Sequence, residues 1–222
     1  MPARRHRIGE VGGRRELILD LPLRIGAVPV TCAQYAAFDP QHEGPRFGGD
    51  EEELGLHPVA DVTWYEAVSF CRWLDRQVPG CSGARLPTAE EWETACRAGT
   101  ESVYWSGDQE DDLAGVGWYS ENSEYRTHRV GEKPANAWGL YDVHGNVWEW
   151  TQTRIADRDA EPEAGGPDPT SGRRVIRGGS FDVGAGLARS AVRLRGEPGH
   201  RSVYLGFRVV LPAPCRDSTL DP

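Results

Sequence analysis

The chain has 222 residues, which is enough for one domain with a core that needs no disulfide bonds. Its formal net charge of −9 argues against nonspecific binding to nucleic acid by the chain as a whole. The sequence has no apolar run of membrane-spanning length, and its basic start is not followed by the apolar stretch of a secretory signal, so we predict a cytoplasmic protein without a membrane partner.

Three segments begin with a capping threonine that is followed three residues later by Glu or Gln, the pattern of a helix start. Two of them continue with apolar residues at helical spacing, over 62–77 and 88–99, and predict the two main helices. Cys71 and Cys96 lie on their apolar faces, and the five cysteines include no CxxC pair, so we predict reduced thiols. The capping pairs are Thr31 with Gln34, Thr63 with Glu66, and Thr88 with Glu91.

Beyond residue 100 the helical periodicity ends, and Gly, Asp, Asn, Ser and Trp become frequent. This composition predicts ordered loops with short strands, in which buried aromatic rings supply much of the core. The stretch 157–172 has almost no large apolar residue and predicts an exposed loop, whereas RVIRGGSF (174–181) and LGFRVVL (205–211) predict strands. Lys133 is the only lysine, a bias that points to a high-GC or thermophilic source.

Positive charge is concentrated near the C-terminus. Residues 173–208 contain eight arginines and two acidic residues, Asp182 and Glu197, which gives a local net charge of +6. One interpretation is a nucleic-acid patch; the other is that the arginines pair with carboxylates of the fold itself. The second is favoured because no aromatic residues are interleaved with the charge. The arginines are Arg173, Arg174, Arg177, Arg189, Arg193, Arg195, Arg201 and Arg208.

Five motifs in order along the chain resemble the formylglycine-generating-enzyme (sulfatase-modifying factor) family. They are PVADVTWYEAVSFCRWL, RLPTAEEWETACRAG, ANAWGLYDVHGNVWEWT, RVIRGGSF and LGFRVV. The resemblance implies an α+β domain of the C-type lectin fold, with two main helices, short antiparallel strands and extensive ordered loops. It covers residues 22–211, preceded by an N-terminal strand or extension (1–21) and followed by a C-terminal tail (212–222).

Oxidases of this family bind copper through two cysteines in the segment between GGS and GFR, and the corresponding positions here are Val183 and Ser190. Copper(I) requires soft thiolate ligands, which neither residue supplies. Another enzymatic branch uses iron held by histidines, but the six histidines of this chain have no HxxxH or HExxH spacing. We therefore predict no catalytic residues and no required cofactor.

A third branch matches the C-terminal segment (residues 178–210) better. This segment resembles the variable region of target proteins of diversity-generating retroelements, which keep a frame of the form GGS…RSA.R.R..P..R...LGFR and change the residues between by mutagenesis at template adenines. The resemblance assigns a scaffold role to Arg177, Gly178, Gly179, Ser180, Arg189, Arg193, Arg195, Arg201, Gly206, Phe207 and Arg208. The implied variable, ligand-binding positions are Asp182, Val183, Gly184, Leu187, Val192, Leu194, Gly196, His200, Ser202, Val203 and Tyr204.

The genetic code provides a test of this assignment. An AAY codon whose two adenines are randomised cannot encode Glu, Gln, Lys, Met or Trp, and none of the eleven variable positions holds one of these residues. The rule requires that Glu197 belongs to the frame.

A surface that tolerates replaced side chains needs a backbone fixed from elsewhere, and the forked donors of arginine suit that role. In an extended chain, Arg193 and Arg195 would point to one side and Val192 and Leu194 to the other. Either the arginines are buried and the apolar residues face a ligand, or the reverse holds. The first orientation predicts an apolar surface for a protein or peptide ligand, with Tyr204 as the anchor.

The motif GNVWEW also allows two interpretations. The family resemblance implies a calcium site formed by the carbonyl oxygens of Gly145 and Val147 with the carboxylate of Glu149, which are oxygen donors that suit Ca²⁺. Alternatively, Asn146 and Glu149 hydrogen-bond the long loops while the tryptophans fill the core.

Three functions therefore remain open: a noncatalytic, retroelement-diversified binding protein, which is the prediction; a copper-dependent formylglycine-generating oxidase; and an undiversified accessory domain of the same fold. A retroelement target protein can belong to a prophage, so phage association is a further expectation for the first of them.

Overall fold

The computed structural model describes residues 4–10, 13, 15–19, 24–44, 53–77, 83–155 and 172–211. Residues 157–171 of the predicted loop (157–172) and the predicted tail (212–222) lie outside these residues. The helices are α1 (Cys32–Ala36), α2 (Trp64–Gln77), α3 (Ala89–Arg97) and α4 (Glu110–Ala114), with 3-10 turns at Leu54–Leu56 (η1) and Ala185–Leu187 (η2). The strands are β1 (Arg4–Ile8), β2 (Arg15–Leu19), β3 (Arg24–Ile25), β4 (Trp148–Arg154), β5 (Arg174–Arg177), β6 (Leu194–Gly196), β7 (Leu205–Gly206) and β8 (Val210–Leu211).

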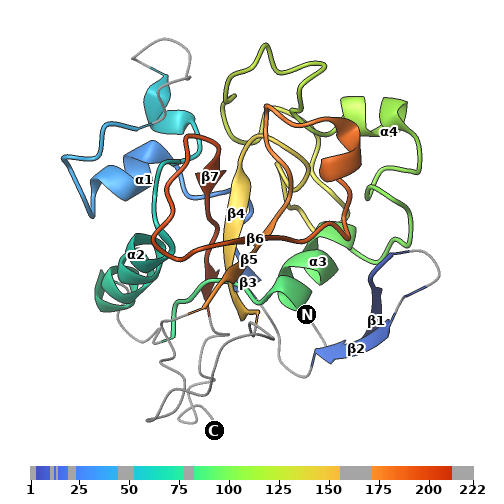
Figure 1. Cartoon of the computed structure of the whole chain (residues 1–222), viewed down its shortest axis with the longest axis horizontal. Helices are drawn as coiled ribbons and strands as arrows, with labels where there is room; N and C mark the ends of the chain where they lie inside the picture. The colour runs from blue at the N-terminus through green and yellow to red at the C-terminus, as the bar shows by residue number, and fades with distance from the viewer. Residues whose placement is uncertain are drawn as a thin grey trace, which may run out of the picture.

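A four-stranded sheet in the order β6-β5-β4-β7 forms the centre of the domain, with α2 on one side and α3 on the other (Figure 1). Strands β4, β5 and β6 are antiparallel, but β7 runs parallel to β4, which the sequence did not predict. The part of the chain that contains η2, β6 and β7 supplies the two outer strands of this sheet and the loops that join them (orange to red in Figure 1). The α+β class and the two main helices are confirmed.

The three predicted helix starts are present. Thr31 and Thr88 form complete capping boxes with Gln34 and Glu91. At the start of α2, the Thr63 amide donates to Glu66 at 2.8 Å, and the Glu66 amide donates to the Thr63 hydroxyl at 3.2 Å. These bonds satisfy amide groups that would otherwise have no partner in the first turn. Helix α4 was not predicted.

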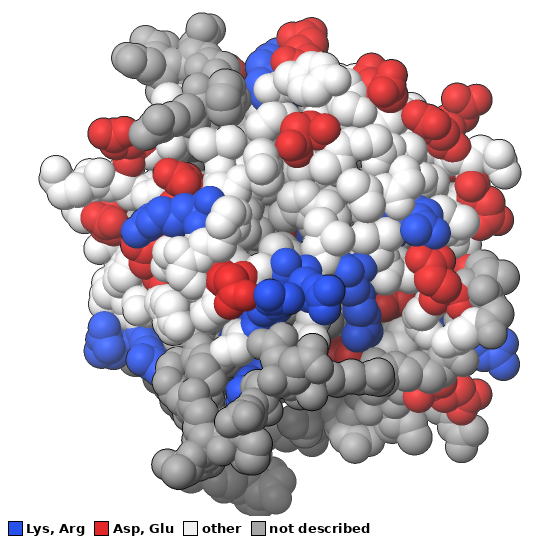
Figure 2. Space-filling model, viewed as in Figure 1, with Lys and Arg blue, Asp and Glu red and all other residues white. Residues whose placement is uncertain are grey.

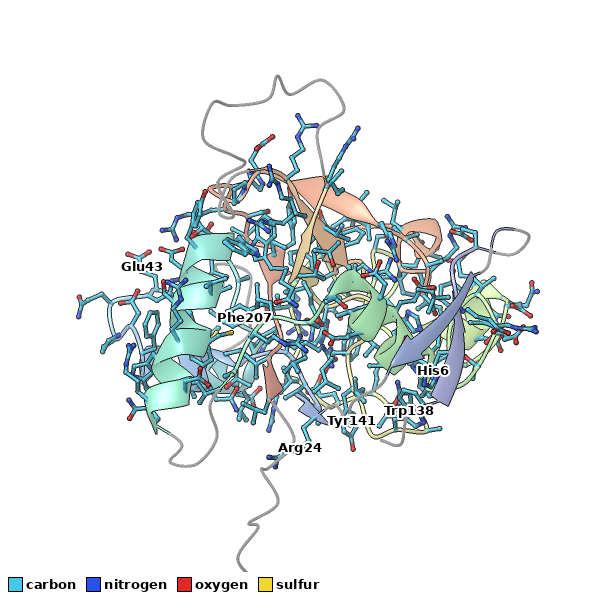
Figure 3. The ribbon with its side chains drawn as sticks, turned by 90° about the horizontal axis from the view of Figure 1, so that it is seen from below. His6, Arg24, Glu43, Trp138, Tyr141 and Phe207 are labelled. Carbon is cyan, nitrogen blue, oxygen red and sulfur yellow. The ribbon has the colours of Figure 1, made fainter. Side chains whose placement is uncertain are left out.

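Strand β4 is buried on both faces, because its first four residues are all inaccessible to solvent. Trp148 and Trp150 belong to the main apolar core with residues of α2, and the intervening Glu149 faces Trp92 of α3. Phe207 lies in the same core beside α2 (Figure 3), with its ring 5.4 Å from that of Phe70. The motif GNVWEW is therefore the start of the central strand.

The N-terminal extension contains an antiparallel hairpin, β1 and β2, that lies beside α3 (Figure 1). The Gly9 amide donates to Glu93 at 2.6 Å, and the guanidinium of Arg97 donates to the Gly9 carbonyl at 3.1 Å. None of the described helices has the length and apolar character that a bilayer crossing requires. The cysteines of the described residues, Cys32, Cys71 and Cys96, are reduced.

Candidate functional site

The C-terminal segment begins beside a fully buried arginine. Arg177 ends β5, and its guanidinium donates to the Glu93 carboxylate at 2.8 Å, to the Ser190 carbonyl at 2.7 Å and to the Val192 carbonyl. Burial lowers the pKa of Arg177 to about 10, against the opposing effect of Glu93, so the side chain is charged at neutral pH. Arg177 thus joins α3 to the backbone of the segment.

A second fully buried arginine follows the segment's last strand. Arg208 donates to both oxygens of Glu149, each at 2.7 Å, and to the carbonyls of Gly26 at 3.1 Å and Tyr141 at 3.0 Å. Burial alone would lower its pKa, but the Glu149 carboxylate outweighs burial and raises it. Trp92 donates to the same carboxylate at 2.7 Å. Residues 178–207 therefore lie between two buried arginines, one bound to Glu93 of α3 and the other to Glu149 of β4.

Between these anchors, main-chain carbonyls hold the path of the segment. Amides from three other parts of the chain donate to the carbonyls of Val183 at 3.0 Å, Ser202 at 2.8 Å and Tyr204 at 2.8 Å. Every residue type has such a carbonyl, so these bonds survive a change of side chain. The donors are the amides of Ser120, Asp61 and Trp148.

Two scaffold glycines have no room for a side chain. A Cβ at Gly206 would lie 2.1 Å from the Val59 carbonyl oxygen, and one at Gly179 would lie 2.9 Å from Cα of Ala188. Gly179 also has a φ of +82°, which disfavours any residue with a Cβ. Scaffold positions that are buried as expected are Arg177, Gly178, Gly179, Ser180, Gly206, Phe207 and Arg208.

The eleven predicted variable positions differ in exposure. Leu187, Leu194 and Tyr204 are 42%, 38% and 38% exposed, large values for apolar and aromatic side chains. Five positions are exposed: Gly184, Leu187, Leu194, His200 and Tyr204. Four are half-buried: Asp182, Val183, Gly196 and Val203.

Three variable positions do not match the expectation that they face solvent. Val192 is buried in the main core, and Ser202 is also buried. Gly196 lies against the core, since a Cβ there would be 2.9 Å from the Trp150 ring and 3.0 Å from Ile176. Replacement at these three positions disturbs packing.

The expected orientation of the arginines is wrong in part. Arg193, Arg195 and Arg201 are exposed and Arg189 is half-buried, so none of them is a buried scaffold residue. The predicted alternation also fails, because Leu194 is exposed together with its two arginine neighbours while Val192 alone is buried. The reason is that the extended strand β6 covers only Leu194–Gly196, so Val192 and Arg193 lie before it and outside a regular alternation of faces.

Pairing of arginines with the fold's own carboxylates is confirmed for six of the eight arginines between 173 and 208. Arg177 and Arg208 are buried together with their partners, Glu93 and Glu149. The other pairs lie at the surface and include Arg201 with Glu66 and Arg173 with Glu197. Figure 2 shows the resulting surface: a basic group lies over β6, uncharged side chains lie above it, and acidic side chains gather along the upper and right-hand edges with a few basic ones among them.

The residues of the predicted calcium site do not fit a cation. Both oxygens of Glu149 accept hydrogen bonds from Arg208, and a calcium ion at this carboxylate would have to displace a buried guanidinium. Asn146 accepts from the His128 amide at 3.1 Å and donates to the His128 carbonyl at 3.1 Å. These contacts agree with the second interpretation of GNVWEW, in which its polar side chains form hydrogen bonds with the loops.

The described residues contain no group of three or more His, Cys, Asp or Glu side chains that could hold a metal ion. At the two positions where the related oxidases have thiolates, Val183 is half-buried and Ser190 is buried. The nearby Cys96 is fully buried, and burial raises the pKa of its thiol to about 12. A thiol of this kind stays protonated and is a poor copper ligand.

His144 is a buried support of the segment that the sequence did not reveal. Its Nδ1 lies 2.7 Å from the Ala188 carbonyl, and its Nε2 accepts from the Trp105 amide at 3.1 Å. These partners require a proton on Nδ1 and none on Nε2. Burial lowers the pKa of His144 to about 4, so the ring is neutral at neutral pH.

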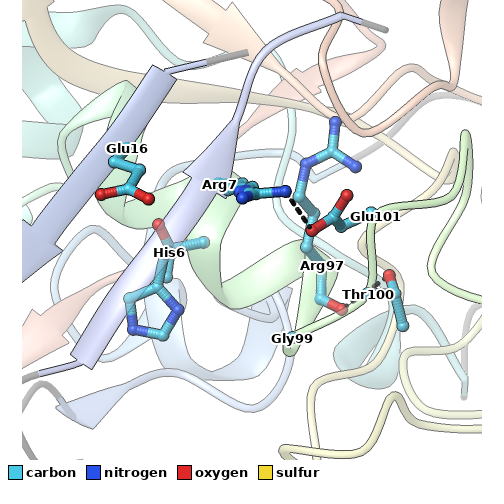
Figure 4. Close-up of a pocket in the computed structure, with 8 residues that line it drawn as sticks. His6, Arg7, Glu16, Arg97, Gly99, Thr100 and Glu101 are labelled. Carbon is cyan, nitrogen blue, oxygen red and sulfur yellow. Dashed lines mark hydrogen bonds and ion pairs between the residues drawn. The ribbon is translucent and has the colours of Figure 1, made fainter.

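A cavity of about 180 Å³ lies away from the segment, between the β1–β2 hairpin and the end of α3 (Figure 4). Its walls are mainly charged and polar, including His6, Glu16 and Thr100. Arg7 and Glu101 form an ion pair across it at 3.5 Å. The mixed charges give this cavity no preference for one class of ligand.

The model of the sulfatase-modifying factor enzyme 1-like domain family matches residues 14–213. The chain belongs to this family. The formylglycine-generating enzyme of Mus musculus is 33% identical over 68% of the chain and 43% of its own length. The hercynine oxygenase of Mycolicibacterium smegmatis is 32% identical over 86% of the chain and 54% of its own length. The chain thus spans about half of these relatives.

Among solved structures, Treponema denticola variable protein 1 has a TM-score of 0.80 and 28% identity, with 96% of this chain and 94% of that chain covered. The family resemblance and the fold predicted from it are confirmed. Within this family, the present chain combines the shared fold with valine and serine at the two positions discussed above.

The first prediction concerns the buried pair of Arg208 and Glu149. Arg208→Met leaves a buried carboxylate without its cation, and we expect it to lower the free energy of unfolding by about 3–5 kcal/mol. Arg129→Ala, which removes one partner of the exposed pair Arg129–Glu53, is the control and is expected to cost less than about 1 kcal/mol. Urea denaturation measures both; equal effects would contradict the role of Arg208 as an anchor.

The second prediction concerns His144. Because its folded-state pKa is depressed from 6.5 to about 4, its contribution to stability is present above pH 6.5 and is lost as the pH falls towards 4. The loss amounts to about 3 kcal/mol. His144→Gln removes this titration, so the free energy of unfolding of the variant should fall less between neutral pH and pH 4 than that of the unmodified chain.

Asp142 titrates in the same range but in the opposite direction. Burial raises its pKa to about 6, so its contribution to stability decreases as the pH rises. The difference between the His144→Gln variant and the unmodified chain cancels this contribution. Parallel pH profiles of the two proteins would show that His144 is not a buried neutral group.

Proposed function

We propose that this chain is a noncatalytic ligand-binding protein whose C-terminal segment is diversified by adenine-directed mutagenesis of a diversity-generating retroelement. The observation that supports this proposal is that the backbone of the C-terminal segment is fixed by groups other than its exposed side chains. Its supports are the buried Arg177 and Arg208 and bonds to main-chain carbonyls, none of which depends on the side chains at the exposed positions. A backbone held in this way can present different side chains in one geometry.

The chemistry of the exposed positions favours a protein ligand. Three of the large apolar or aromatic side chains exposed in the described residues, Leu187, Leu194 and Tyr204, come from this one segment. Such residues supply contact area in protein interfaces, and tyrosine does so at low entropic cost. The similarity to Treponema denticola variable protein 1 over nearly the whole chain also supports the proposal.

The principal alternative is a copper-dependent oxidase of the formylglycine-generating type, which the names of the relatives favour. Such chemistry needs a soft metal site, and Val183 offers no donor atom while the Cys96 thiol is held protonated. An undiversified accessory domain is the other alternative. It shares the binding surface and differs only in the origin of its side chains.

The third prediction tests whether the exposed positions are free to vary. A variant with Asn at Leu187, Leu194, His200 and Tyr204 should unfold cooperatively, with less than about 0.5 kcal/mol lost for each replacement. The two glycines provide a matched pair: Gly184→Ala should be neutral because no atom lies within 4 Å of the added Cβ, whereas Gly196→Ala should cost about 1–3 kcal/mol. Loss of folding in the four-site variant would contradict the proposal.

The fourth prediction separates the three functions. Incubation of the chain with copper, oxygen and a cysteine-bearing sulfatase peptide should yield no formylglycine by mass spectrometry, and its formation would establish the oxidase. Near the coding region we expect a second copy of the 178–210 segment that differs only where the copy has adenine, together with a reverse-transcriptase gene. A genome with neither would favour the undiversified accessory domain.

A further inference from the structure

Arg195 is a cation without a partner among the residues that the structure describes, in a protein that is acidic overall. Its side chain is exposed, and its guanidinium makes no hydrogen bond or ion pair with any residue that the structure describes. The chain as a whole has 34 acidic residues and a net charge of −9. Most neighbouring arginines form an ion pair with a carboxylate of the fold. An exposed arginine without a partner among the described residues can bind an anionic group of another molecule.

Arg193 lies two residues away, directly before β6, and only part of its side chain contacts the fold's own carboxylates. Its Nη1 is 3.2 Å from Glu90 and its Nη2 is 3.8 Å from Glu93, and about a third of the side chain, 34%, is exposed. Glu93 already accepts from Arg177 and Arg97 at shorter distances. The charge of Arg193 and Arg195 is thus only partly neutralised by the described carboxylates, and Figure 2 shows a basic group over β6.

Leu194 places an apolar group between these two arginines. It is 38% exposed, and Arg193 and Arg195 on either side of it are exposed too, so a partner can contact all three side chains. Arginine and leucine side by side form a site for a carboxylate that is followed by an apolar side chain. The planar guanidinium binds a carboxylate with two parallel hydrogen bonds, which fixes the direction of the partner chain.

On the basis of the binding function proposed above, we propose that the protein ligand carries an Asp or Glu side chain that pairs with Arg195, beside an apolar residue that packs on Leu194. Arg195 then supplies a fixed charged contact, and the exposed positions such as Tyr204 supply the selectivity. A nucleic acid fits less well, because the acidic side chains along the edges of this face and the net charge of −9 repel an extended polyanion.

The fifth prediction uses a random-peptide display library, selected on the whole folded chain. We expect the selected peptides to be enriched in Asp or Glu next to an apolar residue. Arg195→Glu should weaken their binding about tenfold or more, and replacing the peptide's acidic residue with Lys should restore binding to this variant. Arg72→Glu, at an exposed arginine of α2, is the matched control and should leave the affinity unchanged.

The outcomes distinguish the inference from the function on which it rests. Peptides that lose binding with Tyr204→Ala but not with Arg195→Glu would overturn the carboxylate contact and leave the binding surface in place. Peptides that are insensitive to both variants, or a library that yields no binder, would overturn both. Tighter binding of a single-stranded oligonucleotide than of any peptide, abolished by Arg195→Glu, would assign the basic group to nucleic acid instead.

Discussion

The fold depends on two buried ion pairs that share one helix. Adjacent residues of α3 reach both of them: Glu93 binds Arg177, and Trp92 donates to the carboxylate of Glu149, which binds Arg208. Burial of such charges has a high desolvation cost, so the pairs are weak contributors to net stability. Their main effect is geometric, because a guanidinium with fixed partners admits one position of the backbone on either side of the C-terminal segment.

This arrangement explains how a domain with few and short strands keeps long loops in order. Loop carbonyls that no sheet ladder satisfies accept from the arginines instead, as those of Ser190, Gly26 and Tyr141 do. A buried carbonyl without a donor is destabilising, so each such bond removes a cost and also fixes a position. His144 acts in the same way on Ala188, and its ring is neutral because burial lowers its pKa.

Local patterns in the sequence predicted the parts of the structure that local forces determine. The capping pairs at Thr31, Thr63 and Thr88 involve residues three positions apart, and all three are present. The helical faces and the strand at 174–177 were predicted from periodicity and residue type. The family motifs then supplied the topology that these elements alone do not determine.

Local sequence patterns did not predict which arginines are buried and which are exposed. Arg177 and Arg193 look alike in sequence, but Arg177 ends the inner strand β5 and is buried against Glu93, whereas Arg193 lies at the surface just before the edge strand β6. The role of Glu149 likewise depends on Arg208, which is 59 residues away. Long-range pairing of this kind leaves no periodic signal, so the sequence allowed both interpretations of each motif.

The packing of the segment sets a limit on how far its side chains can vary. Val192 and Ser202 are buried, and the core leaves no space for a Cβ at Gly196. Randomised AAY codons can encode all three of these residues, but most of the other residues that they encode are larger or more polar than these sites accept. Under the proposed diversification, replacements that preserve the fold would therefore be concentrated at the exposed and half-buried positions. The proposed binding surface would then vary in shape and polarity while the charge of Arg195 stays constant.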